Sequence, residues 1–594
     1  MKTVWHSVLT ALLVCGSAAA FENLAVTATL DVDSSRVTGV MYADRVELPA
    51  GDSILHLRLY ANLACGGSGD SASSTACGIS IDSLMVEGHE YSHLMEYHPA
   101  GLSVVLRRED RRETVRLRVV FRVGIPFGGL RLGRDSDRFR LECWLPVPAP
   151  RSARGWLIED YAGGLGEPVG DLFNYRAEIT YPDTLQLIAP GVVSKSSMGG
   201  TTVAAIEMDS SCDIPLYFSS GYREDSSRVA GTSRRIYYRS EDAFAVDSIA
   251  GWVDYTLEYM SREVMQYPFE EFVVVVGAFD FSGALELPRM IWIPSFSGGV
   301  VTGWPRVTVI HEVIHQWFYG IVASNQASHP WLDESVTQYF AMRINEAIGG
   351  ERGDLVDYFG VQGDYRTVLR MQSKAVFDYA RIDLASSAYK RDTYFGSVYW
   401  KGSQVMATLT GLMGEEGERS FWREYAGAHA YARPTPEDFF RMAERYMPSA
   451  DTGLAERVIG VMVEPDYAIL EIAVEPAAQV LADSGLSPAP LLRSRVEYAV
   501  HHPLRSQVRM QLVMDDGSMV DTVVSSQPGR HEVIIERGDQ YVQRAVIDPD
   551  TAIVIDRDLT NNSLSISREN FGGLRLWSGL TFLVESLFSY VWGW

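Results

Sequence analysis

The sequence predicts a multidomain α+β protein with a β-rich N-terminal domain, a mixed α/β central domain and a C-terminal β-sandwich. Three observations lead to this prediction. The chain has 594 residues, enough for about three or four domains. Apolar and polar residues alternate in its first and last parts, as in half-buried strands, whereas helical spacing dominates between them. The expected domain boundaries are 21–220, 221–455 and 456–565.

The composition indicates a globular protein without a polynucleotide partner. Hydrophobic residues make up 46% of the chain and charged residues 22%, so neither disorder nor a collagen-like repeat fits. The chain has 52 Lys and Arg against 76 Asp and Glu, and its formal net charge is -24. This is the wrong sign for neutralising phosphates, so we expect no nucleic-acid partner.

Residues 1–20 are expected to be a signal peptide. Lys2 precedes a short apolar core, Val8–Cys15, and small residues follow at Ser17–Ala20, where signal peptidase cleaves. A valine stands before Cys15 where a lipoprotein would need a small residue, so lipidation is not expected. A buried first helix is the alternative. We therefore predict an exported protein that is periplasmic, extracellular or membrane-associated.

Four cysteines remain after cleavage, an even number for a chain that would enter an oxidising compartment. Cys65 and Cys77 flank a Gly/Ser-rich stretch, and a bridge between them would hold this loop. The chain-entropy model gives such a bridge about 3 kcal/mol, and we favour this pairing. A cysteine-ligated metal would need C-x-x-C spacing, which is absent from the sequence. Cys143 and Cys212 remain either a second pair or free buried thiols.

Local patterns locate the elements of the first two domains. Period-2 alternation at Ile54–Leu63 and Val115–Val123 predicts strands of the N-terminal β-domain. In the central domain, residues 242–264 have helical spacing. The apolar run Phe272–Ala278 follows and predicts a central strand.

The third domain and the tail come next. Alternation returns from Tyr467 to Asp556, with a turn signal at Asp515–Gly517, and predicts a small β-sandwich. In the tail, 566–594, apolar residues recur every three or four positions from Leu576 to Trp594, which predicts an amphipathic helix. Such a helix would make peripheral membrane contact or dock on the protein itself. Its polar stripe makes spanning a bilayer unfavourable.

The run RVTVIHEVIHQWFYG contains the pattern His311-Glu312-x-x-His315, which indicates a catalytic zinc site. Residues four apart lie one above the other on a helix, so both imidazoles can bind one zinc ion while Glu312 faces its water. Pro305 suits the first turn of such a helix. The alternative is a pair of core histidines beside a surface glutamate.

A catalytic zinc usually has three protein ligands and one open position for water. A metzincin would have a histidine six residues after His315, but Ile321 stands there. Further along, a helix is expected from Pro330 to Gly349, with Glu334 on its first turn and 18 residues between Glu334 and His315. We choose Glu334 as the third ligand of one Zn²⁺ ion.

These residues resemble the zinc aminopeptidases related to aminopeptidase N, whose signature is H-E-x-x-H, 18 residues and E. WLDES at Trp331–Ser335 is similar to the family's WLNEG, and GALEL at Gly283–Leu287 to its GAMEN exopeptidase motif. VYWKG at Val398–Gly402 is similar to the segment that presents the catalytic tyrosine. The likeness covers most of residues 21–560 and implies a thermolysin-like central domain.

Carried over to this sequence, the resemblance implies His311, His315 and Glu334 as zinc ligands and Glu312 as the general base. The residues alone agree, since a carboxylate beside a metal-bound water can take its proton and release a hydroxide to attack a peptide carbonyl. Tyr399 would stabilise the charge that develops on the carbonyl oxygen.

The GALEL segment is expected to bind the substrate's first residue. An edge strand there would hold a peptide by main-chain hydrogen bonds, and we take Gly283 and Ala284 as substrate-binding residues. The resemblance implies that Glu286 pairs with the free α-ammonium group of the substrate.

Two positions depart from the family's pattern. Leu287 replaces an asparagine, so we expect weak binding of small substrates and a preference for apolar first residues that touch Leu287. Ala341 stands where many members have a further glutamate, so support for a ligand histidine must come from elsewhere. The second amine-binding residue of the N-terminal domain is not evident from the sequence.

The sequence thus predicts an exported zinc metalloaminopeptidase that acts on peptides with a free N-terminus. The alternatives are a zinc endopeptidase with the same site and an inactive scaffold that binds peptides.

Overall fold

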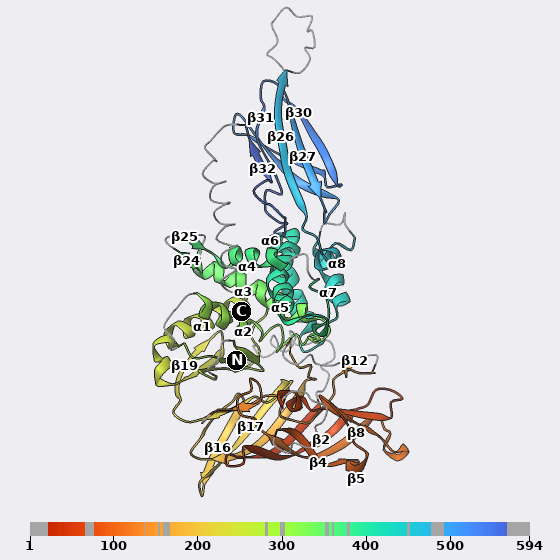
Figure 1. The fold of residues 1–594 in the computed structure, drawn as a ribbon, viewed down its shortest axis with the longest axis vertical. Helices are drawn as coiled ribbons and strands as arrows, with labels where there is room; N and C mark the ends of the chain where they lie inside the picture. Colours follow the sequence, from red (N-terminus) through yellow and green to blue (C-terminus); the bar gives the residue numbers. More distant parts are fainter. Residues whose placement is uncertain are drawn as a thin grey trace, which may run out of the picture. The chain divides into compact units, whose positions relative to one another are not determined.

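The computed structural model describes most of the chain (Figure 1). The chain forms two compact units. The described residues are 22–65, 77–135, 137–152, 155–158, 165, 167–279, 283–296, 303–350, 356–358, 361–376, 381–447, 452–476 and 492–566. The first unit comprises Met1–Ala250 and Pro268–Gly299, and the second comprises Gly251–Tyr267 and Val300–Trp594. The predicted signal peptide and the predicted amphipathic helix of the tail lie outside the described residues.

An eight-stranded sheet dominates the first unit. Its order is β16 (Val192–Met198), β17 (Thr201–Ser211), β14 (Phe173–Pro182), β1 (Glu22–Asp31), β2 (Arg36–Glu47), β8 (Thr114–Gly124), β4 (Gly78–Val86) and β5 (His89–Glu90). Strand β1 pairs in parallel with β14 and antiparallel with β2. Its residues alternate strictly between buried and exposed, as period-2 patterning requires.

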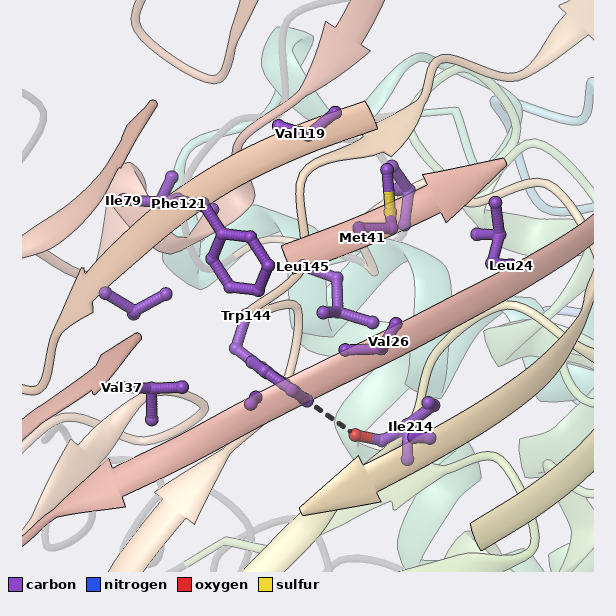
Figure 2. Close-up of a cluster of buried hydrophobic side chains, with 14 of the residues drawn as sticks. Leu24, Val26, Val37, Met41, Ile79, Val119, Phe121, Trp144, Leu145 and Ile214 are labelled. Carbon is purple, nitrogen blue, oxygen red and sulfur yellow. Dashed lines mark hydrogen bonds between the residues drawn. The ribbon is translucent and has the colours of Figure 1, made fainter. Parts of the chain in front are cut away.

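The buried face of this sheet packs into one apolar core (Figure 2). Trp144 and Phe121 lie in this cluster, with their ring centroids 6.1 Å apart. The indole Nε1 of Trp144 donates a hydrogen bond of 2.9 Å to the carbonyl of Ile214. This bond satisfies the polar end of an otherwise apolar side chain, which is how tryptophan is accommodated in a core.

Smaller sheets complete the β-rich part. They are β15 (Gln186–Ile188), β18 (Leu216–Ser219), β10 (Phe139–Leu141) and β9 (Gly133–Arg134); β11 (Val147–Pro148), β3 (Ile54–Arg58), β7 (Gly101–Val105) and β6 (Glu96–His98); and the pair β12 (Arg151–Ser152) and β13 (Gly155–Trp156). The strand predicted at Val115–Val123 is confirmed by β8. The strand predicted at Ile54–Leu63 is too long, because the chain turns at Leu59, whose carbonyl accepts from the amide of Asn62, and continues as a 3₁₀ helix, η1 (Tyr60–Cys65).

A five-stranded sheet follows in the first unit. Its order is β19 (Arg223–Val229), β20 (Thr232–Tyr238), β21 (Glu271–Val276), β23 (Met290–Ile293) and β22 (Leu285–Leu287). Strand β21 pairs in parallel with both neighbours, and its valines are fully buried. The central strand predicted at Phe272–Ala278 is therefore confirmed. Among the described strands, β22 is one of the two edges of this sheet, and β19 is the other.

Helices form the main part of the second unit. They are α2 (Trp304–Ile314), α3 (Glu334–Gly349), α4 (Tyr365–Val376), α5 (Arg391–Tyr394), α6 (Gly402–His429), α7 (Pro436–Ala443) and α8 (Leu454–Ile459); β24 (Val356–Tyr358) and β25 (Val361–Gly363) form a hairpin. Helix α1 (Val246–Glu263) begins in the first unit and continues into the second. Helix α2 has Pro305 in its first turn, as predicted.

The C-terminal part of the second unit consists of two sheets. One contains β26 (Asp466–Pro476), β27 (Leu492–His501) and β30 (Gly529–Glu536); the other contains β29 (Met519–Ser525), β28 (Gln507–Met514), β31 (Val542–Ile547) and β32 (Ser563–Ser565). The predicted hairpin at Asp515–Gly517 joins β28 to β29, and Gly517 has the positive φ of 82° that this turn needs. In the part of the chain that the structure describes, no helix is both long and apolar enough to cross a membrane.

Candidate active site

Helix α2 and the residue that follows it bring two histidines together in the second unit. The main-chain amide of His315 donates to the carbonyl of His311, so the two residues lie one turn apart. Their Nε2 atoms are 3.1 Å from each other. The spacing in the sequence therefore gives the geometry it predicts, since residues four apart share one face of a helix.

Glu334, the first residue of α3, completes a group of three donor atoms. Its Oε2 lies 3.3 Å from Nε2 of His311 and 3.4 Å from Nε2 of His315. In a tetrahedral zinc site with bonds of about 2.0–2.1 Å, donor atoms lie about 3.3–3.4 Å apart. The three donors thus have the identity and the mutual distances that a zinc ion requires.

The protonation states of this group suit a metal. Burial alone would raise the pKa of Glu334, but the charges and hydrogen bonds of His315 and His311 outweigh burial and hold this pKa well below its usual range. Burial also lowers the pKa of His311. The glutamate is therefore a carboxylate and the histidine a neutral imidazole at neutral pH, which are the forms that bind metal.

Asp333 supports His315 from the other side of the ring. Its Oδ1 lies 2.7 Å from Nδ1 of His315, and both side chains are buried. Oγ1 of Thr337 is 3.4 Å from the same nitrogen. Burial raises the pKa of Asp333 to about 7, although His315 opposes that rise. The sequence contains this aspartate within WLDES, but the pattern alone does not indicate a partner for it.

The predicted general base and tyrosine belong to the same unit. Glu312 is buried on α2, next in sequence to the ligand His311. Tyr399 lies on a π-helical turn, η7 (Phe395–Lys401), and its hydroxyl donates a hydrogen bond to Oε1 of Glu334. Its ring also stacks on the imidazole of His311, with centroids 5.6 Å apart. The hydroxyl therefore lies directly beside the proposed zinc ligands.

Close packing holds the π-helical turn against α3. The hydroxyl of Ser335 donates a 2.6 Å hydrogen bond to the carbonyl of Val398. A Cβ atom at position 402 would overlap the side chain of Ser335, so only glycine allows this approach. The WLDES and VYWKG segments, which lie far apart in the sequence, thus meet through Ser335 and Gly402.

Glu286 lies in the first unit on strand β22 and is buried. Gly283, just before this strand, has φ of +124°, a conformation that side-chain-bearing residues rarely adopt, and Ala284 is half-buried. The expectation that Leu287 meets the substrate is wrong, because its side chain is fully buried in the apolar cluster of the five-stranded sheet. In a strand, residues 286 and 287 point to opposite faces.

One arginine and four acidic residues of the first unit form a connected group that we call the Arg131 cluster: Arg131, Glu142, Glu167, Asp213 and Glu286. Arg131 pairs with Glu142 at 2.5 Å and also with Glu167, and Glu167 is hydrogen-bonded to Glu286. Burial raises the pKa of Glu142 to about 8 and that of Asp213 to about 6. It raises the pKa of Glu167 well above the usual range, against the opposing charge of Arg131.

The Arg131 cluster supplies residues that sequence reasoning missed. The role of a second amine-binding group had no candidate, and Glu167 is the carboxyl that contacts Glu286. Glu167 lies in a Gly/Pro-rich segment without periodicity, so no pattern identifies it. Glu142 has a detectable signal, because an acid in the apolar run LECWLPVP must find a partner when the run is buried.

Cys143 and Cys212 are not joined by a disulfide. The side chain of Cys65 lies outside the described part of the chain, so its bridge to Cys77 stays a prediction.

Residues 256–459 match the peptidase family M1 domain. The chain is 23% identical over 233 residues to aminopeptidase M1-B from Oryza sativa subsp. japonica, which covers 37% of the chain and 26% of that protein. It is 22% identical over 298 residues to leucine aminopeptidase 2 from Aspergillus terreus, and the match covers 47% of this chain and 40% of that protein. The chain thus spans well under half the length of these relatives.

Solved structures show the same fold at low identity. Legionella pneumophila aminopeptidase A in complex with aspartic acid matches with a TM-score of 0.64 and 11% identity, over 90% of this chain and 59% of that chain. An M1 zinc metallopeptidase from Deinococcus radiodurans matches with a TM-score of 0.53 and 15% identity, over 75% of this chain and 94% of that chain. The predicted multidomain α+β architecture is therefore confirmed.

Proposed function

We propose that this chain, whose residues 256–459 belong to peptidase family M1, is a zinc aminopeptidase that removes the N-terminal residue from peptides. The observation that carries the proposal is the set of three buried donors, Nε2 of His311, Nε2 of His315 and Oε2 of Glu334, which lie 3.1 to 3.4 Å apart. A group of two imidazoles and one carboxylate is the ligand set of a hydrolytic zinc with an open position.

His311, His315 and Glu334 would hold the zinc ion, which would supply Lewis acidity that makes water easier to deprotonate and polarises the scissile carbonyl. Glu312 accepts the proton of the attacking water and passes it to the leaving amine, and its place beside a ligand histidine on α2 supports that role. The hydroxyl of Tyr399, held beside Glu334, donates to the oxygen on which negative charge develops.

The exopeptidase part of the proposal assigns the substrate's α-ammonium group to Glu286 and Glu167. It is supported by the GALEL resemblance and by the contact between these two carboxyl groups. Charge-assisted hydrogen bonds between an ammonium group and carboxylates are strong enough to favour a free N-terminus over a blocked one. Gly283 and Ala284 would present main-chain groups to the first residue of the peptide.

We also propose that the chain is exported, on the evidence of the signal-peptide pattern in residues 1–20. The amphipathic pattern of Leu576–Trp594 supports peripheral contact with a membrane. Removing 576–594 should then release the protein from membranes without loss of peptidase activity.

A panel of fluorogenic aminoacyl and peptide substrates, each free and N-acetylated, tests the activity. The purified protein is assayed with and without a zinc chelator, and its metal content is measured. Free substrates should be cleaved and blocked ones spared, and the chelator should abolish cleavage until zinc is restored.

Equal cleavage of free and acetylated peptides would contradict the aminopeptidase assignment and support an endopeptidase. A natively purified protein that contains no zinc and cleaves nothing would support the inactive scaffold. An exposed Glu415→Gln variant on α6 provides the control for substitutions of acidic residues.

A further inference from the structure

Asp333 is a buried carboxylate that the hydrolytic steps do not use. It lies between the short helix η5 (Pro330–Leu332) and α3, directly before the ligand Glu334. The residue has no solvent exposure, and its Oδ1 lies 2.7 Å from Nδ1 of His315. A carboxylate so deeply buried is costly unless a partner compensates its charge.

The hydrogen bond to Asp333 determines which nitrogen of His315 can bind metal. Nδ1–H of the ring donates to the carboxylate, which leaves the lone pair on Nε2. That Nε2 is the atom 3.1 Å from Nε2 of His311 and 3.4 Å from Oε2 of Glu334. The aspartate therefore selects the tautomer and fixes the ring in the orientation that the zinc site needs.

The surroundings of Asp333 favour a cation. Its second oxygen, Oδ2, is buried without a hydrogen-bond partner among the described residues. With Glu334 next to it in the chain, two acids lie on either side of one imidazole. A divalent ion bound to His315 would offset both charges at once, because electrostatic attraction is strong in a buried site.

Ala341 cannot supply this support. It lies on α3 one turn after Thr337, which contacts the same Nδ1 of His315, but its side chain is a buried methyl group. His311 has two side-chain neighbours on α3, the carboxylate of Glu334 and the amide of Gln338. What distinguishes His315 is a carboxylate, that of Asp333, at the ring nitrogen that does not face the other proposed zinc ligands.

We propose that Asp333 is a positioning residue that orients His315, increases its basicity and so raises the affinity of the site for zinc. The inference rests on the proposed function only in requiring that zinc binds to these ligands. It concerns metal affinity and is therefore measured without any substrate.

The test measures the dissociation constant of zinc by competition with a chromophoric chelator for the full-length wild type, Asp333→Asn and Asp333→Ala. Loss of a carboxylate that supports a ligand histidine typically weakens metal binding by about 10- to 100-fold. We expect a loss in this range for Asp333→Ala and a smaller one for Asp333→Asn, which keeps an acceptor oxygen but loses the charge.

Asp556→Asn is the matched control. Asp556 is also buried, and it accepts hydrogen bonds from the amide of Tyr467 and from Asn562, far from the zinc ligands in the chain. The zinc affinity of the Asp556→Asn variant should equal that of the wild type. Thermal unfolding of the metal-free proteins shows whether each variant folds. If Asp333→Ala does not fold, the nearly isosteric Asp333→Asn decides the outcome.

Wild-type zinc affinity in a folded Asp333 variant would overturn the inference while leaving the proposed function intact. Absence of zinc binding in the wild type would overturn the proposed function itself. An equal loss of affinity in Asp556→Asn would show a general effect of destabilisation and would also overturn the positioning role.

Discussion

Glu334 in the second unit and three acids of the Arg131 cluster in the first unit are all buried, but their pKa values shift in opposite directions. In the second unit, the pKa of Glu334 is held low because two imidazoles outweigh the effect of burial. In the first unit, Glu142, Glu167 and Asp213 share one arginine, and burial raises the pKa of each. The partners of a buried acid thus decide whether it carries charge.

The difference shows what each group can do. Ionised Glu334 beside the neutral imidazole of His311 is ready to bind a metal ion. The Arg131 cluster has more carboxyl groups than its one arginine can neutralise. The remaining carboxyl groups therefore stay protonated when no other cation is bound. An α-ammonium group is a cation that could replace such a proton. Substitutions in the two groups should therefore affect different measured quantities.

The largest effect is expected from Glu312→Gln. Losing the general base should lower kcat by at least about 10²–10⁴-fold while zinc content stays unchanged, since Glu312 is not a ligand. Kinetics and metal analysis on the same sample check this, with exposed Glu415→Gln as the control. Activity close to that of the wild type would exclude Glu312 as the base.

Tyr399→Phe should have the next largest effect. Removing one donor to the oxyanion typically costs about 10²–10³-fold in kcat, with little change in KM. Tyr425→Phe is the control, because the buried hydroxyl of Tyr425 has no hydrogen-bond partner among the described residues. A change confined to KM would instead place Tyr399 in ground-state binding.

Glu286→Ala should act on selectivity. The lost bond to a charged group corresponds to about 1.5–3 kcal/mol, or roughly 10- to 150-fold in the ratio of kcat/KM for free over N-acetylated substrates. Exposed Glu178→Ala on β14 should leave this ratio unchanged. An unchanged ratio in Glu286→Ala would refute the amine-binding role.

The smallest effect, on stability and not on turnover, is expected from Glu142→Gln. Because burial raises the pKa of Glu142 from its ordinary 4.5 to about 8, the folded protein keeps a proton that the unfolded chain releases between these values. The free energy of unfolding of the first unit should fall by about 1–3 kcal/mol as the pH rises from 5 to 8.

Glu142→Gln should flatten this pH dependence, which denaturant unfolding at several pH values would measure. Exposed Glu178→Gln serves as the control. An unfolding free energy that rises with pH in the wild type, and equally in the Gln variant, would contradict the protonated state of Glu142.

The two histidines of the zinc group could be predicted because they lie at helical spacing, and Glu334 could be predicted from its place at the start of the next expected helix, with 18 residues between it and His315. Strand β8 and the β28–β29 hairpin followed in the same way from local periodicity. The Arg131 cluster could not be predicted, since Arg131, Glu142, Glu167, Asp213 and Glu286 come from five separate segments that only the tertiary fold brings together. The expected contact between Leu287 and the substrate was wrong because the direction of a side chain in an edge strand depends on the register, which the motif does not reveal.

The π-helical turn that carries Tyr399 makes the site sensitive to chain length. A π turn accommodates one residue more than a regular helical turn, so deleting a residue from Phe395–Lys401 could restore an uninterrupted α-helix from α5 into α6. Each residue advances an α-helix by about 100°, so the shortened helix would rotate the tyrosine away from Glu334 by about that angle. In the more regular helix, the hydroxyl of Tyr399 would no longer donate its hydrogen bond to Glu334.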